Sequence, residues 1–148
     1  MRKFKLWFPV LIVAFCLSAG AALAGAKSKS SSRIKWHDYK AGMTLAKKQN
    51  KQVYLHFYTD WCDYCKEMQS TTFRNPAVVK MLNQEFVAIK VNTIKHHKLA
   101  AKYNIRPVPD NWFLSSNGSK IRNFLGYYEP DQFVTVLRYV NDTLVSKK

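Results

Sequence analysis

A pair of cysteines placed directly after a short apolar run narrows the possible folds of this chain more than any other part of its sequence. Residues 52–59, QVYLHFYT, are apolar, branched and aromatic, which predicts a buried strand. Residues 61–66, WCDYCK, follow and open a stretch rich in helix formers. Cys62 is therefore expected in the first turn of a helix, with Cys65 one turn further on the same face. The spacing of the two cysteines alone is compatible with a structural disulfide, a metal site or a redox-active pair.

The rest of the pattern alternates helices with strands. A last helix opens at Glu129-Pro130-Asp131, with an apolar stripe of Phe133, Val134, Leu137, Val140, Leu144 and Val145. Before it we expect a helix within 36–51 that starts near Asp38, two helical pieces divided at Asn75-Pro76, a strand at 86–91, a helix at 94–103 and a hairpin turning at Asn117-Gly118. Strands joined through helices pair in parallel, and the hairpin adds antiparallel strands. The prediction is an α/β fold with a mixed central sheet and helices on both faces.

The first 24 residues have the charged, apolar and small-residue regions of a secretory signal peptide, with cleavage expected after Ala24. Their apolar core is shorter than the ~20 residues of a membrane span, which disfavours the alternative of an uncleaved anchor. Residues 25–35 are mostly small, polar and basic, which predicts a flexible leader before a single domain at 36–148. Export would place the domain where disulfides can form and persist.

The number of cysteines and the net charge limit the functions that the chain can have. Cys16 would leave with the signal peptide, and the remaining pair closes a loop too short to stabilise much by chain entropy, so a purely structural disulfide explains it poorly. The formal net charge is +15, but the lysines are scattered and form no dense block. This favours an ordinary solvated surface over an acidic partner, and export disfavours nucleic acid.

Redox chemistry suits the position of the pair. A helix N-terminus stabilises an anion, so Cys62 is expected to be the exposed nucleophile and Cys65 the thiol that resolves a mixed disulfide. Lys66 favours a thiolate and Asp63 opposes it. A zinc site that adds His96 and His97 is an alternative, although adjacent histidines rarely point at one ion. A binding module without turnover is another, and haem attachment would require histidine where Lys66 stands.

The motif WCDYCK resembles the active site of the thioredoxin superfamily, with Val108-Pro109 at the family's cis-proline position and Gly126 in the last strand. Residues 58–82, YTDWCDYCKEMQSTTFRNPAVVKML, are similar to the C-terminal thioredoxin-like domain of the transmembrane thiol reductant carrier DsbD and to its single-domain periplasmic relatives. The resemblance implies a periplasmic thiol-disulfide oxidoreductase of the thioredoxin fold. It favours a reductase over an oxidase or isomerase.

The resemblance also implies roles and partners. Cis-Pro109 would turn the backbone of Val108 toward a substrate strand, and Trp61 would shield the site and contact partners. We expect a monomer that acts on protein thiols and disulfides, needs no cofactor because the electrons reside on sulfur, and is recharged by a membrane-bound donor.

Two positions depart from the family pattern. His56 stands where a buried acid is usual, and a near-neutral imidazole there could accept a proton from Cys65 or be only a hydrogen-bonded strand histidine. Asp110 follows the proline where threonine is common, and its charge could alter the choice of partner.

Overall fold

The computed structural model describes residues 32–145, so the predicted signal peptide and most of the predicted leader lie outside the described residues. The elements, in chain order, are β1 (Trp36–His37), α1 (Tyr39–Gln49), β2 (Gln52–Tyr58), α2 (Asp63–Ser70), the 3-10 turn η1 (Thr72–Arg74), α3 (Pro76–Glu85), β3 (Phe86–Asn92), α4 (His97–Lys102), β4 (Asp110–Leu114), β5 (Lys120–Leu125) and α5 (Pro130–Val145). The side chains of Leu144 and Val145 lie outside the described part.

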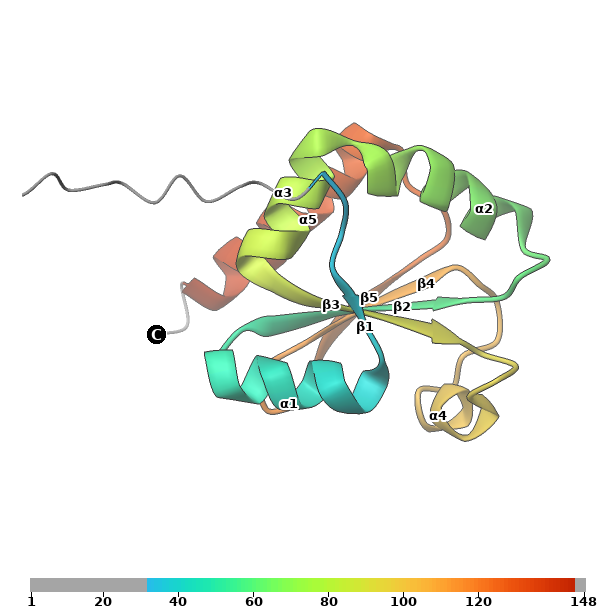
Figure 1. Cartoon of the computed structure of the whole chain (residues 1–148), viewed down its shortest axis with the longest axis horizontal. Helices are drawn as coiled ribbons and strands as arrows, with labels where there is room; N and C mark the ends of the chain where they lie inside the picture. Colours follow the sequence, from blue (N-terminus) through green and yellow to red (C-terminus); the bar gives the residue numbers. More distant parts are fainter. Residues whose placement is uncertain (1–31, 146–148) are drawn as a thin grey trace, which may run out of the picture.

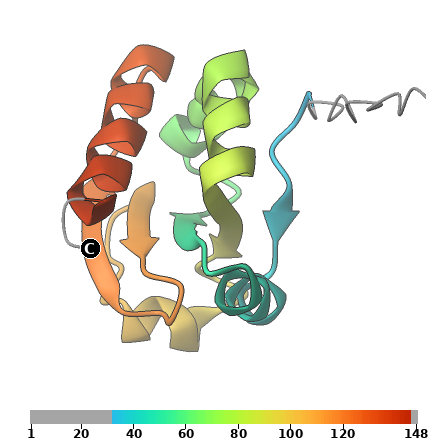
Figure 2. The ribbon, with the colours of Figure 1, turned by 90° about the vertical axis from the view of Figure 1, so that its left-hand side faces the viewer.

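A five-stranded sheet in the order β1-β3-β2-β4-β5 forms the centre of the molecule. Strands β1 and β2 run parallel to β3, whereas β4 pairs antiparallel with both β2 and β5. Helices α2, α3 and α5 cover one side of the sheet, and α1 and α4 cover the other (Figure 1; Figure 2). The predicted mixed sheet with helices on both faces is confirmed.

The start of the domain differs from the prediction in two ways. Trp36 and His37 form the short strand β1 instead of helix, and the helix begins only after Asp38, whose carboxylate accepts a hydrogen bond from the backbone of Ala41 at 2.9 Å. The predicted leader included residues 33–35, but these residues are bound to the domain. Asn83 of α3 bonds the backbone on either side of Ile34, which is buried in the core.

Helix α4 is shorter than the predicted helix at 94–103. The side chain of Asn92 accepts hydrogen bonds from the backbone N–H groups of Ile94 and Lys95, at 3.0 and 3.2 Å, and holds that segment in a turn. Among residues 32–145, no helix combines the length and apolar character that crossing a membrane requires.

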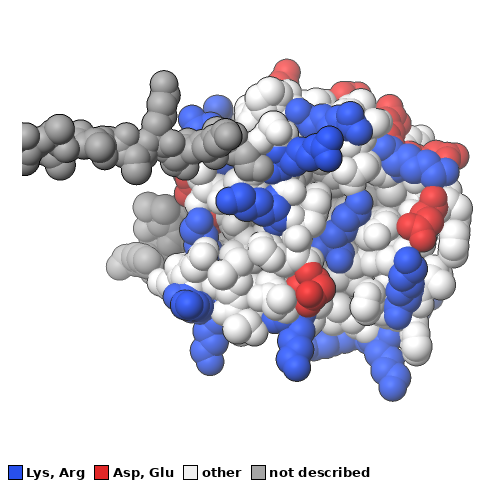
Figure 3. Space-filling view, in the orientation of Figure 1, with Lys and Arg blue, Asp and Glu red and all other residues white. Residues whose placement is uncertain are grey.

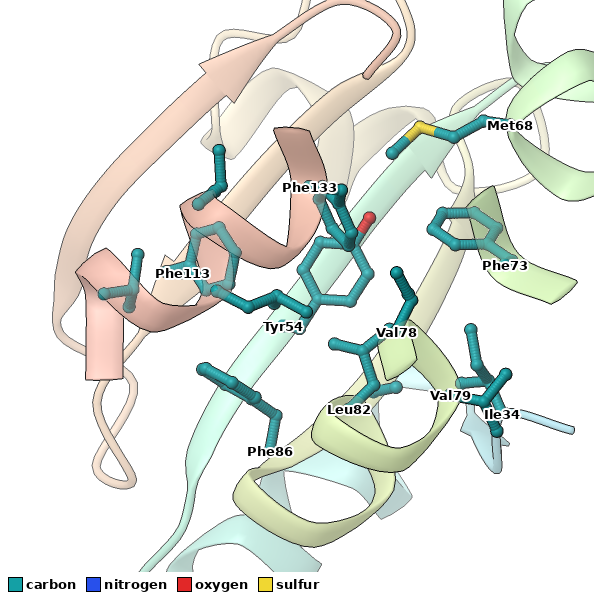
Figure 4. Close-up of a cluster of buried hydrophobic side chains, with 14 residues drawn as sticks. Ile34, Tyr54, Met68, Phe73, Val78, Val79, Leu82, Phe86, Phe113 and Phe133 are labelled. Atoms are coloured by element: carbon teal, nitrogen blue, oxygen red, sulfur yellow. The ribbon is translucent and has the colours of Figure 1, made fainter. Parts of the chain in front are cut away.

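Two apolar clusters lie on opposite sides of the sheet because the side chains of β2 alternate. Tyr54 points into the cluster beneath α2, α3 and α5, where it packs with Phe113, Phe133 and Met68 (Figure 4). Val53, Leu55 and Phe57 belong to the cluster beneath α1 and α4. Burial on both faces explains why the sequence of β2 is an almost uninterrupted apolar run.

Candidate active site

The two cysteines lie where β2 leads into α2, as predicted. Cys62 is the N-cap of α2, and its Sγ accepts a hydrogen bond from the backbone N–H of Cys65 at 3.1 Å. A disulfide joins the pair, with the two Cα atoms 5.2 Å apart. Cys62 is partly exposed, whereas Cys65 is only 5% exposed. One sulfur is therefore within reach of a partner, and the other lies behind it in the core.

The surroundings of Cys62 favour a thiolate after reduction. Its sulfur occupies the position that a capping oxygen usually takes at a helix start, where backbone N–H groups lack partners within the helix. The positive end of the helix dipole adds to this effect. Lys66 and Asp63, whose opposing effects were noted above, form an exposed ion pair of 3.2 Å with each other. Their net influence on the sulfur is small because each charge offsets the other.

The loop before β4 packs against the cysteines. The peptide bond between Val108 and Pro109 is cis, and the carbonyl oxygen of Val108 lies 3.6 Å from Sγ of Cys62. The N–H of Gly126 donates to the carbonyl oxygen of Pro109 at 2.8 Å. Gly126 has a φ of +93°, a conformation that a side chain would strain. The residues that the resemblance singled out are thus brought together from three distant parts of the chain.

Exposed apolar side chains gather at this end of the sheet. Trp61, Tyr64, Ile94 and Leu125 are 53–66% exposed, and each follows or ends a strand or begins a helix beside the disulfide. Tyr64 stacks on Tyr127 with ring centroids 6.2 Å apart. Of this group, sequence reasoning identified only Trp61. Ile94 was assigned to a helix, and nothing local shows that β5 brings Leu125 opposite Asp110.

His56 belongs to a buried polar cluster. Asn111 donates both amide N–H groups, to the carbonyl oxygens of Phe124 and Gly126, so its Oδ1 faces the other way as an acceptor. That oxygen accepts from Tyr54 Oη at 2.7 Å and lies 2.9 Å from Nδ1 of His56. Nδ1 must therefore carry the proton, which leaves Nε2 as an acceptor. Nε2 is buried and has no hydrogen-bond partner in the described structure.

The expectation that His56 titrates near neutrality is wrong. Burial lowers the pKa of His56 to about 3, and the nearby positive charge of Lys90 lowers it further, although the hydrogen bond to Asn111 opposes these effects. The imidazole therefore stays neutral at physiological pH. It is a hydrogen-bonded strand histidine, and it is too weak a base to hold a proton taken from a thiol.

Asp110 does not display its charge to a partner as expected. The side chain is buried, and its carboxylate accepts from Nε1 of Trp112 at 3.0 Å and from Nδ2 of Asn123 at 3.1 Å. Burial raises the pKa of Asp110, and these hydrogen bonds act in the opposite direction. The carboxylate therefore links β4 to β5 beneath the surface.

The four residues of the alternative zinc site do not form a ligand set. Cys62 and Cys65 are joined to each other, and His96 and His97 lie exposed at the start of α4. In the described part of the chain, no group of three or more histidine, cysteine or acidic side chains is placed to hold a metal ion.

Comparison with known proteins agrees with this geometry. A family model described as a thioredoxin-like domain matches residues 39–141. The chain is 37% identical over 100 residues to the thiol:disulfide interchange protein DsbD of Neisseria meningitidis serogroup B, a match that covers 64% of this chain and 17% of that protein. DsbD of Yersinia pestis is 31% identical over 99 residues, with the same coverage of 64% and 17%. The chain thus spans well under two thirds of these relatives.

Solved structures give the same result. The crystal structure of the C-terminal domain of Neisseria meningitidis DsbD in the reduced form is 30% identical, with a TM-score of 0.59 over 68% of this chain and 91% of that domain. A thioredoxin from Thermus thermophilus has a TM-score of 0.67 at 24% identity, over 73% of this chain and 87% of its own, which shows likeness of fold.

Proposed function

The chain belongs to the thioredoxin-like family and is a thiol-disulfide oxidoreductase, and from this premise we propose that it acts as an exported, periplasmic reductase of protein disulfides. The observation that carries the proposal is the position of Cys62, whose partly exposed sulfur caps α2 beside the carbonyl oxygen of Val108. The direction of electron flow is supported by the similarity of residues 58–82 to a thiol reductant carrier.

The proposed cycle begins with both cysteines reduced. The thiolate of Cys62 attacks one sulfur of a substrate disulfide, and the other substrate sulfur leaves as a thiolate and takes up a proton. Cys65 then attacks Sγ of Cys62 and releases the second substrate sulfur as a thiol. Two electrons pass from the cysteine pair to the substrate, and the pair ends as the disulfide seen in the structure.

We propose that the substrate is bound as an extended segment. The backbone of Val108 beside Cys62 would pair with it by main-chain hydrogen bonds, and Trp61 would contact the flanking side chains. Tyr64 enlarges this apolar surface. Such recognition depends little on sequence, because every substrate segment offers the same backbone groups.

Each cycle leaves the pair oxidised, so a dithiol donor must return two electrons. In an oxidising compartment we propose a membrane-bound donor, with this chain acting as a monomer and without a cofactor. The similarity to DsbD, a thiol:disulfide interchange protein, supports this arrangement.

Replacing Cys62 with serine tests the mechanism. We expect Cys62→Ser to lose exchange on a model protein disulfide completely, because the other cysteine of the described structure, Cys65, is buried. Cys65→Ser should retain the first step and accumulate mixed disulfides, which non-reducing electrophoresis detects. Equal turnover in Cys62→Ser and the unaltered chain would refute the mechanism and favour a binding module.

The reduction potential of the Cys62/Cys65 couple tests the direction. A value near that of thioredoxin, about −270 mV, is expected of a reductase, whereas a value near about −120 mV would identify an oxidase. Equilibration with glutathione or a dithiol of known potential measures it, and Cys65→Ser provides the control that cannot form the intramolecular disulfide.

A further inference from the structure

Basic side chains that are scattered in the sequence gather on one side of the folded chain. Helix α1 and the turn after it contribute Lys40, Lys47, Lys48 and Lys51. Helix α4 and the loops beside it contribute Lys95, Lys98, Lys102 and Arg106. We call this surface the basic face. All of these side chains are exposed or partly exposed.

Lys120 of β5 extends the same surface. Its Nζ lies 4.7 Å from the ring centroid of Tyr103 and 4.8 Å from that of Trp112, both of which pack in the cluster beneath α1 and α4. Two carboxylates lie on this side of the sheet, that of Asp38 before α1 and that of the buried Asp110, which accepts from Trp112 and Asn123. Within residues 32–145, none of the nine cations of the basic face has a carboxylate at ion-pair distance, so their charges are not offset by close partners.

The opposite side of the molecule has a more even balance of positive and negative charges. The helices α2, α3 and α5 and the loops beside them carry the carboxylates of Asp63, Glu67, Glu85, Glu129, Asp131 and Asp142. Eight cations lie on the same side: Lys66, Arg74, Lys80 and Arg138 on the helices, and Arg33, Lys35, Lys90 and Arg122 on the segments packed beside them. In Figure 3, basic side chains project from the lower margin, where Figure 1 shows α1 and α4, whereas most of the carboxylates lie toward the upper right, among further basic side chains. The basic charges that are scattered in the sequence are therefore unevenly distributed between the two sides of the sheet.

The composition of the basic face favours binding to a fluid anionic surface over binding to a fixed anionic site. Eight of its nine cations are lysines, which act as mobile point charges and lack the planar fork by which arginine grips a fixed phosphate or carboxylate. Neither α1 nor α4 has a strongly exposed large apolar side chain in the described structure. A protein interface usually has an apolar core, and binding of single-stranded nucleic acid usually needs exposed aromatic rings.

We propose that the basic face adsorbs the protein onto a membrane through anionic phospholipid headgroups. The disulfide lies at the carboxyl end of β2, beside this face and not within it, so the reactive edge stays open along the membrane surface. This inference extends the proposed function, in which a membrane-bound donor recharges the cysteines. Adsorption would raise the local concentration of the protein near that donor and would weaken with salt.

Vesicle sedimentation tests the proposal on the full chain as purified from cells. We expect binding to vesicles that contain phosphatidylglycerol, weaker binding to vesicles of phosphatidylcholine alone, and a steep fall with added salt. Changing Lys47, Lys48, Lys98 and Lys102 to glutamine should weaken anionic-vesicle binding by at least ~100-fold, because each lysine near a charged bilayer contributes roughly a tenfold factor or slightly less.

The matched control removes the same net charge from the other side. Changing Lys35, Arg74, Lys80 and Arg138 to glutamine should alter binding by less than a few-fold, since these groups would lie farther than a Debye length from the membrane surface. Equal losses in the two variants, or equal binding to both vesicle types, would overturn the proposal. So would binding to polyglutamate without binding to vesicles, which would indicate an acidic protein partner. Exchange on a soluble disulfide should be unchanged in both variants, so failure of adsorption is distinguishable from failure of the proposed function.

Discussion

The core beneath α2, α3 and α5 contains the hydrogen-bonded cluster of Tyr54, His56 and Asn111. The side beneath α1 and α4 instead has separate polar contacts, between Tyr39 and Tyr103 and between Trp112 and Asp110. The two outer surfaces also differ, since α1 and α4 carry the basic face and the other helices carry mixed charges. The same strands supply both sides, because successive residues of β2 point to opposite faces.

The buried cysteine of the active site lies on the same side of the sheet as the polar cluster. Cys65 and Met68 lie three residues apart on the buried face of α2, and Met68 packs in the cluster that includes Tyr54. The buried cysteine therefore enters the side of the molecule that holds the polar cluster. On the other side, the residues that β2 contributes are all apolar: Val53, Leu55 and Phe57. Three substitutions test this contrast, in order of decreasing effect.

Removing the centre of the polar cluster should have the largest effect. Asn111→Ala would leave four groups without their partner: the Tyr54 hydroxyl, the His56 Nδ1–H and two backbone carbonyls. Since each unpaired buried group costs about 1–3 kcal/mol, we expect the free energy of unfolding to fall by about 4 kcal/mol, measured by denaturant titration. Asn123→Ala, at an exposed position of β5, is the control and should cost about 1 kcal/mol. Similar losses in both variants would contradict the central role of Asn111.

The titration of His56 should contribute to the pH dependence of the free energy of unfolding. Its pKa is about 3 when folded and about 6.5 when unfolded, so between these values the unfolded chain binds more protons. Stability is therefore full above pH 6.5 and is lost as pH falls toward 3. The contribution of His56 should be about 3 kcal/mol between pH 7 and pH 4.

His56→Gln removes the titrating group and should reduce the slope of unfolding free energy against pH over that interval. His96→Gln, at an exposed position, should leave the slope intact. Urea titration at several pH values compares the two variants. An identical slope in His56→Gln and the unaltered chain would show that other groups cause the acid sensitivity.

Adding a methyl group between α1 and β3 should destabilise the protein. A methyl group at Gly42 of α1 would lie 2.6 Å from Cδ1 of Ile89 and 3.2 Å from Cβ of His37, closer than packed atoms normally approach. Although alanine is the better helix former, we expect Gly42→Ala to lower the free energy of unfolding by about 2 kcal/mol. Thr44→Ala, exposed on the same helix, should change it by less than about 0.5 kcal/mol. Stabilisation by Gly42→Ala would show that α1 packs loosely over β3.

The sequence predicted most of the elements and the position of the reactive pair. The apolar run of β2, the helix formers after Cys62 and the turn at Asn117-Gly118 are local signals, and each led to the correct element. The short strand β1 was missed because its two residues become a strand only by pairing with Ala88 and Ile89. The ordered start of the domain was missed because Asn83, which holds it, is 48 residues from Lys35.

By itself, the sequence determined that Cys62 would lie at the start of a helix directly after a buried strand, because both elements are indicated by neighbouring residues. The tertiary structure alone decided that His56 is neutral, that Asp110 is buried and that the lysines share one face. Tyr54 and Asn111 are 57 positions apart, and the two helices of the basic face are separated by three other helical elements and two strands. A pKa and a surface charge depend on distances through space, and only the folded sheet brings these groups together.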